Sequence, residues 1–167
     1  MDTYFDLGGY SFPVTTQSTE AQTWFDRGIL WTYGYNHEEA VTCFEHAIDA
    51  DPECAMAHWG AGYASGPNYN MPWDLFDYAG RVAAAQAGYT HARKALDLID
   101  GVTGWEAALI HALQARHPQP DPLDSKAMKA WNADFADAMR DVFIAHPESH
   151  EVRTVFAESL LNLTPWK

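Results

Sequence analysis

The sequence is poor in positive charge, and it contains no long apolar run. Only 10 residues are Lys or Arg, against 23 Asp or Glu, which gives a formal net charge of −13. A field of that sign repels phosphate backbones and anionic lipid headgroups. No stretch approaches the ~18 consecutive apolar residues that a transmembrane helix needs. The expected partners are therefore neither nucleic acids nor membranes.

Cysteine is also scarce. Cys43 and Cys54 are the only two thiols, and they do not form a C-x-x-C pair. So few cysteines exclude a disulfide scaffold and are usual in a reducing compartment. The first residues lack the basic segment and apolar run of a secretory signal peptide. We therefore expect a cytoplasmic protein.

Sequence signatures of catalysis and of cofactor binding are missing. The chain has no Gly-rich phosphate loop, no G-x-S-x-G nucleophile elbow and no H-E-x-x-H metal motif. The one H-x-x-x-H spacing, His146 and His150, is interrupted by a proline, which breaks a shared helical face. Convergence of His37, His58 and His111 would depend on how the helices stack. We expect no cofactor and no metal, and leave enzymatic activity open.

Apolar and aromatic side chains, in contrast, are abundant. Hydrophobic residues make up 47% and aromatic residues 14%, including seven Trp and eight Tyr. A chain of this length and composition can bury a sizeable core in one domain. Apolar residues recur at helical spacing, as in Ala40, Cys43, Phe44 and Ala47, and no segment of useful length alternates as a strand would. The predicted class is all-α.

About seven helices are expected after a non-helical N-terminal arm at residues 1–18. The arm contains Gly8, Gly9 and Pro13, and Ser18 offers an N-cap for the first helix. Turn-rich or proline-rich segments separate the later helices. The sequence predicts helices at about 19–33, 37–50, 53–65, 74–99, 104–116, 125–145 and 148–163.

The stretch from 21 to 54 contains small, aromatic and proline residues at regular spacings, namely Trp24, Gly28, Ala40, Phe44, Ala47 and Pro52. Small residues at Gly28 and Ala40 would let two helices approach, and Phe44 would fill the gap between them. This pattern resembles the tetratricopeptide (TPR) consensus, and Gly62 repeats Gly28 one period of 34 residues later. The resemblance implies a TPR-like α-solenoid of three to four helix pairs over 19–167, with divergent later repeats. A generic helical bundle is the alternative.

A narrower resemblance rests on His37, on the Cys54–Ala55–Met56 run, on Trp59–Gly60 and on the Gly-Pro-Asn-Tyr-Asn (GPNYN) loop at residues 66–70. These motifs are similar to those of a poorly characterised family of larger bacterial and fungal TPR proteins. The resemblance covers nearly the whole chain. Because family members are longer, it implies that the chain is either the N-terminal part of a longer array or a short natural form.

In a TPR array the first helix of each pair lines the concave surface. That register places six candidate residues on this surface, namely Phe25, Ile29, Tyr33, Trp59, Tyr63 and Glu158. No basic residue is present there to bind a terminal carboxylate, so we expect an aromatic groove for a peptide or protein partner. The alternative is that these rings pack against one another or against the N-terminal arm.

A second hypothesis is an enzyme or small-molecule-binding protein with a pocket around the GPNYN loop. Asn68 and Asn70 would offer amide groups from the loop, and His37, Arg116 and Glu158 would complete the pocket. A structural role for His37, satisfied by carbonyl groups of the loop, is equally compatible with its place at a helix start.

The last predicted helix is apolar on its surface. Three leucines, Leu160, Leu161 and Leu163, would be exposed there in a monomer. Self-association through this helix is therefore a third expectation.

Overall fold

A computed structural model describes residues 4–166. These residues form seven α-helices and one short 3₁₀-helix, and within them no strand forms beyond an isolated bridge between Asn68 and Met71. The elements are α1 (Thr19–Tyr33), α2 (His37–Ala50), α3 (Ala55–Ser65), η1 (Trp73–Leu75), α4 (Tyr78–Asp97), α5 (Gly104–Arg116), α6 (Ser125–Ala145) and α7 (His150–Leu161). The predicted all-α class and the predicted number of helices are confirmed.

Side-chain caps decide where the helices begin. Ser18 accepts a hydrogen bond from the Ala21 backbone N–H, as a helix N-cap does. The predicted helix at 74–99 begins later than expected because the Asp77 carboxylate accepts from the Gly80 N–H at 2.7 Å and caps α4 there. The residues just before it form η1 instead.

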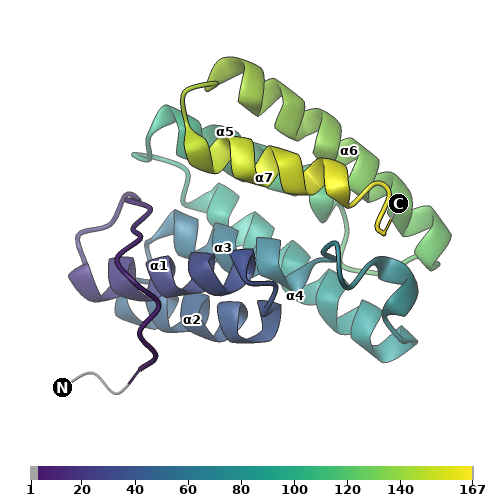
Figure 1. Ribbon diagram of the computed structural model, residues 1–167, viewed down its shortest axis with the longest axis horizontal. Coiled ribbons are helices and arrows are strands. Elements are labelled where there is room, and N and C mark those ends of the chain that lie inside the picture. The colour runs from purple at the N-terminus through teal and green to yellow at the C-terminus, as the bar shows by residue number, and fades with distance from the viewer. Residues whose placement is uncertain (1–3, 167) are drawn as a thin grey trace.

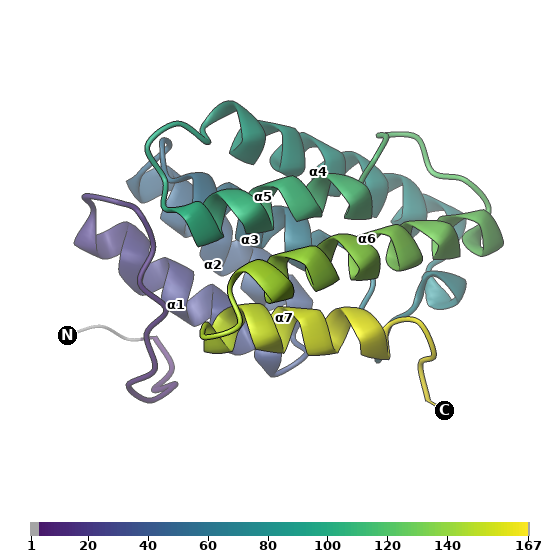
Figure 2. The ribbon, with the colours of Figure 1, turned by 90° about the horizontal axis from the view of Figure 1, so that it is seen from above.

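The helices pack in chain order, and α3 lies at the centre of the packing (Figures 1 and 2). It contacts α1, α2, α4 and α5, and every residue from Ala55 to Ala64 is buried. Close approach of α1, α2 and α3 depends on two glycines. A Cβ at Gly28 or at Gly60 would lie under 3.0 Å from the Phe44 ring. Residues of any larger size would separate these helices.

The N-terminal arm is packed and hydrogen-bonded, although residues 4–18 contain no helix. Figure 1 shows it running across α1. Phe12 is buried and stacks on Trp105 of α5 with 5.1 Å between ring centroids. The Thr15 N–H and hydroxyl both donate to the buried Glu106 carboxylate, at 2.7 and 2.6 Å. The arm therefore ties α1 to α5.

Helix α7 packs on α6 and also reaches the side of the molecule formed by α1 and α3 (Figure 2). Val152 and Val155 anchor it in the core. Within residues 4–166, no helix combines the length and the apolar character that crossing a bilayer requires. Helix α7 thereby closes one side of a groove lined by residues of α1, α3 and α7.

Candidate functional site

A groove of about 380 Å³ opens where the α1–α2 turn, α3 and α7 meet, and we call it the tyrosine groove. It brings together four of the predicted site residues, Tyr33, His37, Tyr63 and Glu158. These come from distant parts of the sequence, and a hydrogen bond between Tyr63 of α3 and Glu158 of α7 joins the two sides of the groove. The full lining consists of Thr32, Tyr33, Tyr35, His37, Tyr63, Arg153, Thr154, Ala157, Glu158 and Leu161.

The Glu158 carboxylate is fixed on the wall of the groove. The Tyr63 hydroxyl donates to Glu158 Oε2 at 2.6 Å, and Asn162 Nδ2 donates to Oε1 at 2.6 Å. Burial, together with the charge of Glu158, raises the pKa of Tyr63 well above its ordinary value of 10.0. Tyr63 therefore stays a protonated donor at neutral pH. Because a carboxylate has more lone pairs than these two donors use, Glu158 can still accept from a ligand.

His37 begins α2 and lies in the groove as a neutral imidazole. Burial, helped by the charge of Arg116, lowers its pKa to about 4, and a hydrogen bond with the Ala64 carbonyl only partly opposes this. Nδ1 lies 3.0 Å from the Ala64 oxygen. Since a carbonyl can only accept, we infer that Nδ1 carries the proton. Nε2 is then an acceptor.

Arg116 lies behind the groove rather than in its lining. Its guanidinium carbon is 4.6 Å from the centroid of the Tyr63 ring and 5.0 Å from that of Phe135. Nη2 donates to the Pro67 carbonyl, whereas Nε and Nη1 have no hydrogen-bond partner within the described residues. A side chain at Gly66 would collide with this guanidinium. Arg116 thus supports Tyr63 from beneath.

Three candidates from the sequence lie in the core instead of the groove. Phe25, Ile29 and Trp59 are at most 1% exposed. Trp59 stacks on Tyr63 with 5.2 Å between ring centroids, and its Nε1 donates to the Leu109 carbonyl at 3.1 Å. They are covered because the α1–α3 interface is enclosed by the neighbouring helices and by the N-terminal arm. The rings of Phe25 and Trp59 thus pack against other aromatic rings, as in the alternative to an aromatic groove.

The asparagines of the GPNYN loop also lie outside the groove. Asn68 Oδ1 accepts from the backbone N–H of Asn70 at 2.9 Å and of Met71 at 3.0 Å. The side chain of Asn70 is exposed. This Asx turn gives the loop its shape, so the loop supports Arg116 through the Pro67 carbonyl and offers no amide to the groove.

Several lining residues were missed from the sequence, and Tyr35 is the most informative of them. It occupies the turn between α1 and α2 with φ of 59°, in the left-handed region that a tyrosine rarely adopts. The Gly34–Tyr35–Asn36 turn was the available signal, because the left-handed position of such a turn is normally filled by Gly or Asn. Thr154, Ala157 and Leu161 gave no comparable signal, since only tertiary packing turns α7 toward α1.

Two further points from the sequence concern the histidines as metal ligands and self-association through the C-terminal leucines. Within residues 4–166, no three His, Cys, Asp or Glu side chains gather in a geometry that could hold a metal ion. His58 pairs with His91, their Nδ1 atoms 3.2 Å apart, and not with His37 or His111. Leu160, Leu161 and Leu163 are 37%, 48% and 43% exposed. Self-association through these leucines stays a prediction.

Comparison with known proteins adds no assignment to this geometry. No protein-family model matches the chain, and no curated protein or solved structure does so. The resemblance to TPR proteins accordingly rests on the spacing of residues such as Gly28 and Phe44.

Proposed function

We propose that the chain is a TPR-type binding module that holds a short peptide segment of a protein partner in the tyrosine groove. Two contacts support the TPR-type arrangement. Helix α1 packs against α3, and α3 against α5, as the first helices of successive TPR pairs would. The observation that carries the proposal is the groove itself, in which a fixed carboxylate lies among tyrosine rings.

The chemistry of the groove suits an apolar peptide side chain flanked by backbone N–H groups. Tyr33, Tyr35, Tyr63 and Leu161 offer ring and aliphatic surface for the side chain. His37 Nε2 and the Glu158 carboxylate offer acceptors for N–H donors. The volume of about 380 Å³ falls near the lower end of the roughly 300–1,000 Å³ typical of ligand pockets. One anchor side chain, rather than a whole partner helix, is the expected occupant.

A random peptide library displayed on phage tests the proposal directly. The wild-type chain should enrich peptides that share one large apolar residue. Ala157 is exposed and lines the groove, so Ala157→Trp should fill it and abolish binding of those peptides. Ala130→Trp is the matched control, because Ala130 is exposed on α6 away from the groove. Enriched peptides that bind both variants equally well would refute a role for the groove.

A small-molecule or enzymatic function is the second candidate, and the orientation of His37 favours it. A neutral imidazole held through Nδ1 presents Nε2 as a base, the arrangement found in many catalytic sites. Against this, a base with a pKa of about 4 accepts protons poorly near neutral pH. Binding without catalysis is therefore the better-supported function. A screen of ester and amide substrates in which turnover depends on His37 would reverse that order.

A further inference from the structure

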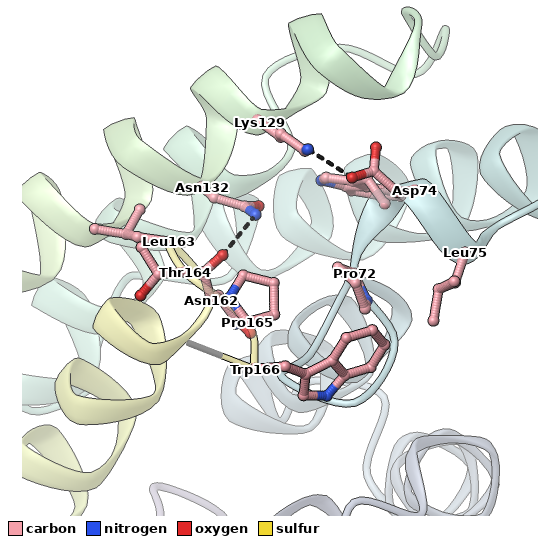
Figure 3. A pocket seen from close by; sticks show the side chains of 11 residues that line it. Pro72, Asp74, Leu75, Lys129, Asn132, Asn162, Leu163, Thr164, Pro165 and Trp166 are labelled. Carbon is pink, nitrogen blue, oxygen red and sulfur yellow. Dashed lines mark hydrogen bonds and ion pairs between the residues drawn. The ribbon is translucent and has the colours of Figure 1, made fainter.

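A second cavity, of about 300 Å³, lies between η1, α6 and the segment that follows α7. Figure 3 shows Lys129 and Asn132 of α6 on one side of it, and Trp166 with Pro72 on the other. It shares no lining residue with the tyrosine groove. We call it the amide pocket.

Three buried polar atoms of this pocket have no hydrogen-bond partner within the described residues. They are the indole Nε1 of Trp73 and the side-chain Oδ1 atoms of Asn132 and Asn162. All three side chains line the cavity, and they are 1%, 5% and 5% exposed. Buried polar groups in folded proteins are almost always paired. Three unpaired groups around one cavity therefore indicate an occupant that pairs with them.

The orientation of both asparagine amides is fixed by their other hydrogen bonds. Asn162 Nδ2 donates to Glu158 Oε1 at 2.6 Å, and this oxygen accepts from the amide N–H. Asn132 Nδ2 donates to the backbone oxygen of Asn162 at 3.4 Å, and a carbonyl can only accept. Turning either amide over would set oxygen against oxygen. The three unpaired groups are consequently two acceptor oxygens and one indole donor, because Trp73 Nε1 cannot accept.

The charge and the walls of the pocket narrow the ligand further. Lys129 Nζ is paired with Asp74 Oδ2 at 2.5 Å, so the two charges offset each other. Pro72 and Trp166 contribute flat, apolar surface. A neutral molecule with a planar ring fits these walls better than an ion or a flexible chain does.

We propose that the amide pocket binds a small neutral aromatic molecule that carries a primary carboxamide. Such a group has two N–H donors for the oxygens of Asn132 and Asn162, and one carbonyl oxygen for the indole N–H of Trp73. The ring of the ligand lies against Trp166 and Pro72. Each donor and acceptor of the carboxamide then has a hydrogen-bond partner in the pocket, and the ligand ring has an apolar surface to pack on.

Titration with benzamide, followed by the indole N–H signals of ¹⁵N-labelled protein, tests this proposal. The Trp73 signal, identified by its loss in Trp73→Phe, should move in a saturable way. N,N-dimethylbenzamide lacks both donors, and benzoate lacks them and carries a charge. Both should bind at least about tenfold more weakly, the effect of one lost hydrogen bond in a buried site. Equal shifts with all three probes, or no shift up to about 10 mM benzamide, would overturn the proposal, the latter assigning the three atoms to water.

Variants separate this pocket from nonspecific binding. Asn132→Leu removes one acceptor and should weaken benzamide by about tenfold. Asn70→Ala, on an exposed asparagine outside the pocket, should leave it unchanged. If Asn132→Leu does not fold, Trp73→Phe keeps the ring, loses the donor and should weaken benzamide likewise, as measured by calorimetry. Wild-type affinity for benzamide in a folded Asn132→Leu or Trp73→Phe variant would contradict the proposed carboxamide site. Stronger binding of glucose than of benzamide would also contradict it and would indicate a sugar site.

Discussion

The interior around Phe44 and the interior around Arg116 are both buried, but different forces hold them together. Phe44 lies between two glycines, Gly28 and Gly60, and the contacts there are apolar and close. Arg116 and His117 are buried just as deeply, yet Nε and Nη1 of Arg116 have no hydrogen-bond partner in the part of the chain that is described. Close packing explains the first interior. It does not explain the second.

The second interior carries an energetic cost that an apolar one would avoid. A buried polar group without a partner costs roughly 1–3 kcal/mol, and a buried ion more. Arg116 lies against the Tyr63 ring, and its charge contributes to the lowered pKa of His37. The less stable chemistry thus underlies the tyrosine groove, while the Phe44 interior supplies the stability. The proposed binding site and the main apolar packing therefore lie in different interiors.

Truncation of Phe44 should have the largest effect. Phe44→Ala removes a fully buried ring between two glycines that cannot fill the space. We expect the free energy of unfolding to fall by about 3–5 kcal/mol, as measured by urea denaturation. Ile144→Ala is the control, because Ile144 is 68% exposed and should change stability by less than about 0.5 kcal/mol. A small loss for Phe44→Ala would remove the contrast between the two interiors.

Acid should destabilise the Arg116 interior in particular. Burial, and secondarily the charge of Arg116, lowers the pKa of His117 from 6.5 to about 3. Between these two values the unfolded chain binds a proton at His117 that the folded chain does not. Stability is therefore full above pH 6.5 and falls with pH below it, by up to about 1.4 kcal/mol per pH unit from this residue.

The variant His117→Asn isolates that contribution. Its free energy of unfolding should depend on pH less steeply than that of the wild type between pH 6.5 and 5, with the other titrating groups common to both proteins. His111→Asn, on an exposed histidine of α5, should retain the wild-type slope. Identical slopes for wild type and His117→Asn would mean that His117 is not held neutral by the fold.

Loss of the Tyr63 hydroxyl should have an intermediate effect. Tyr63→Phe keeps the ring between Trp59 and Arg116 but removes the donor to Glu158. Since a hydrogen bond to a charged group contributes about 1.5–3 kcal/mol, we expect a loss near the lower value, because Asn162 still donates to the carboxylate. Tyr10→Phe, whose exposed hydroxyl donates to Glu151, should change thermal stability much less. Equal losses would argue that Glu158 is not fixed by Tyr63.

Much of the fold followed from local signals, whereas the site depended on tertiary packing. Caps such as Ser18, and the turn-rich or proline-rich segments between helices, predicted most helix bounds within a few residues. The start of α4 was misplaced because the apolar residues of η1 look helical until Asp77 is recognised as the cap. Periodicity identifies which face of a helix is apolar, but not what covers it. Phe25 and Trp59 were therefore indistinguishable from groove residues.

The amide pocket could not be predicted from the sequence. Asn132 lies on the buried face of an amphipathic helix, where a polar residue gives no indication of its partner. Trp73 is brought to it only by the packing of η1 against α6. Asn162 follows α7, and the packing of α6 against α7 brings it to Asn132. Which polar atoms stay unpaired depends on the hydrogen bonds of the folded chain, and the sequence does not give these.

The smallest effect on stability should come from Tyr35, and it should run opposite to the effect on binding. The left-handed conformation costs an L-residue roughly 1–2 kcal/mol, and Asn adopts it more readily than Tyr. Tyr35→Asn should therefore raise the free energy of unfolding by about 0.5 kcal/mol while weakening the peptides selected on the tyrosine groove. Tyr35→Ala loses the same ring without relieving the backbone, so it should bind equally weakly and be less stable than Tyr35→Asn. Thermal denaturation and peptide titration measure these stabilities and affinities. The expected result would show that the Tyr35 ring contributes to binding in the groove while its left-handed backbone lowers the stability of the turn. If Tyr35→Asn is the less stable variant, the ring contributes to packing, and Tyr35 belongs with Phe44 rather than with the groove.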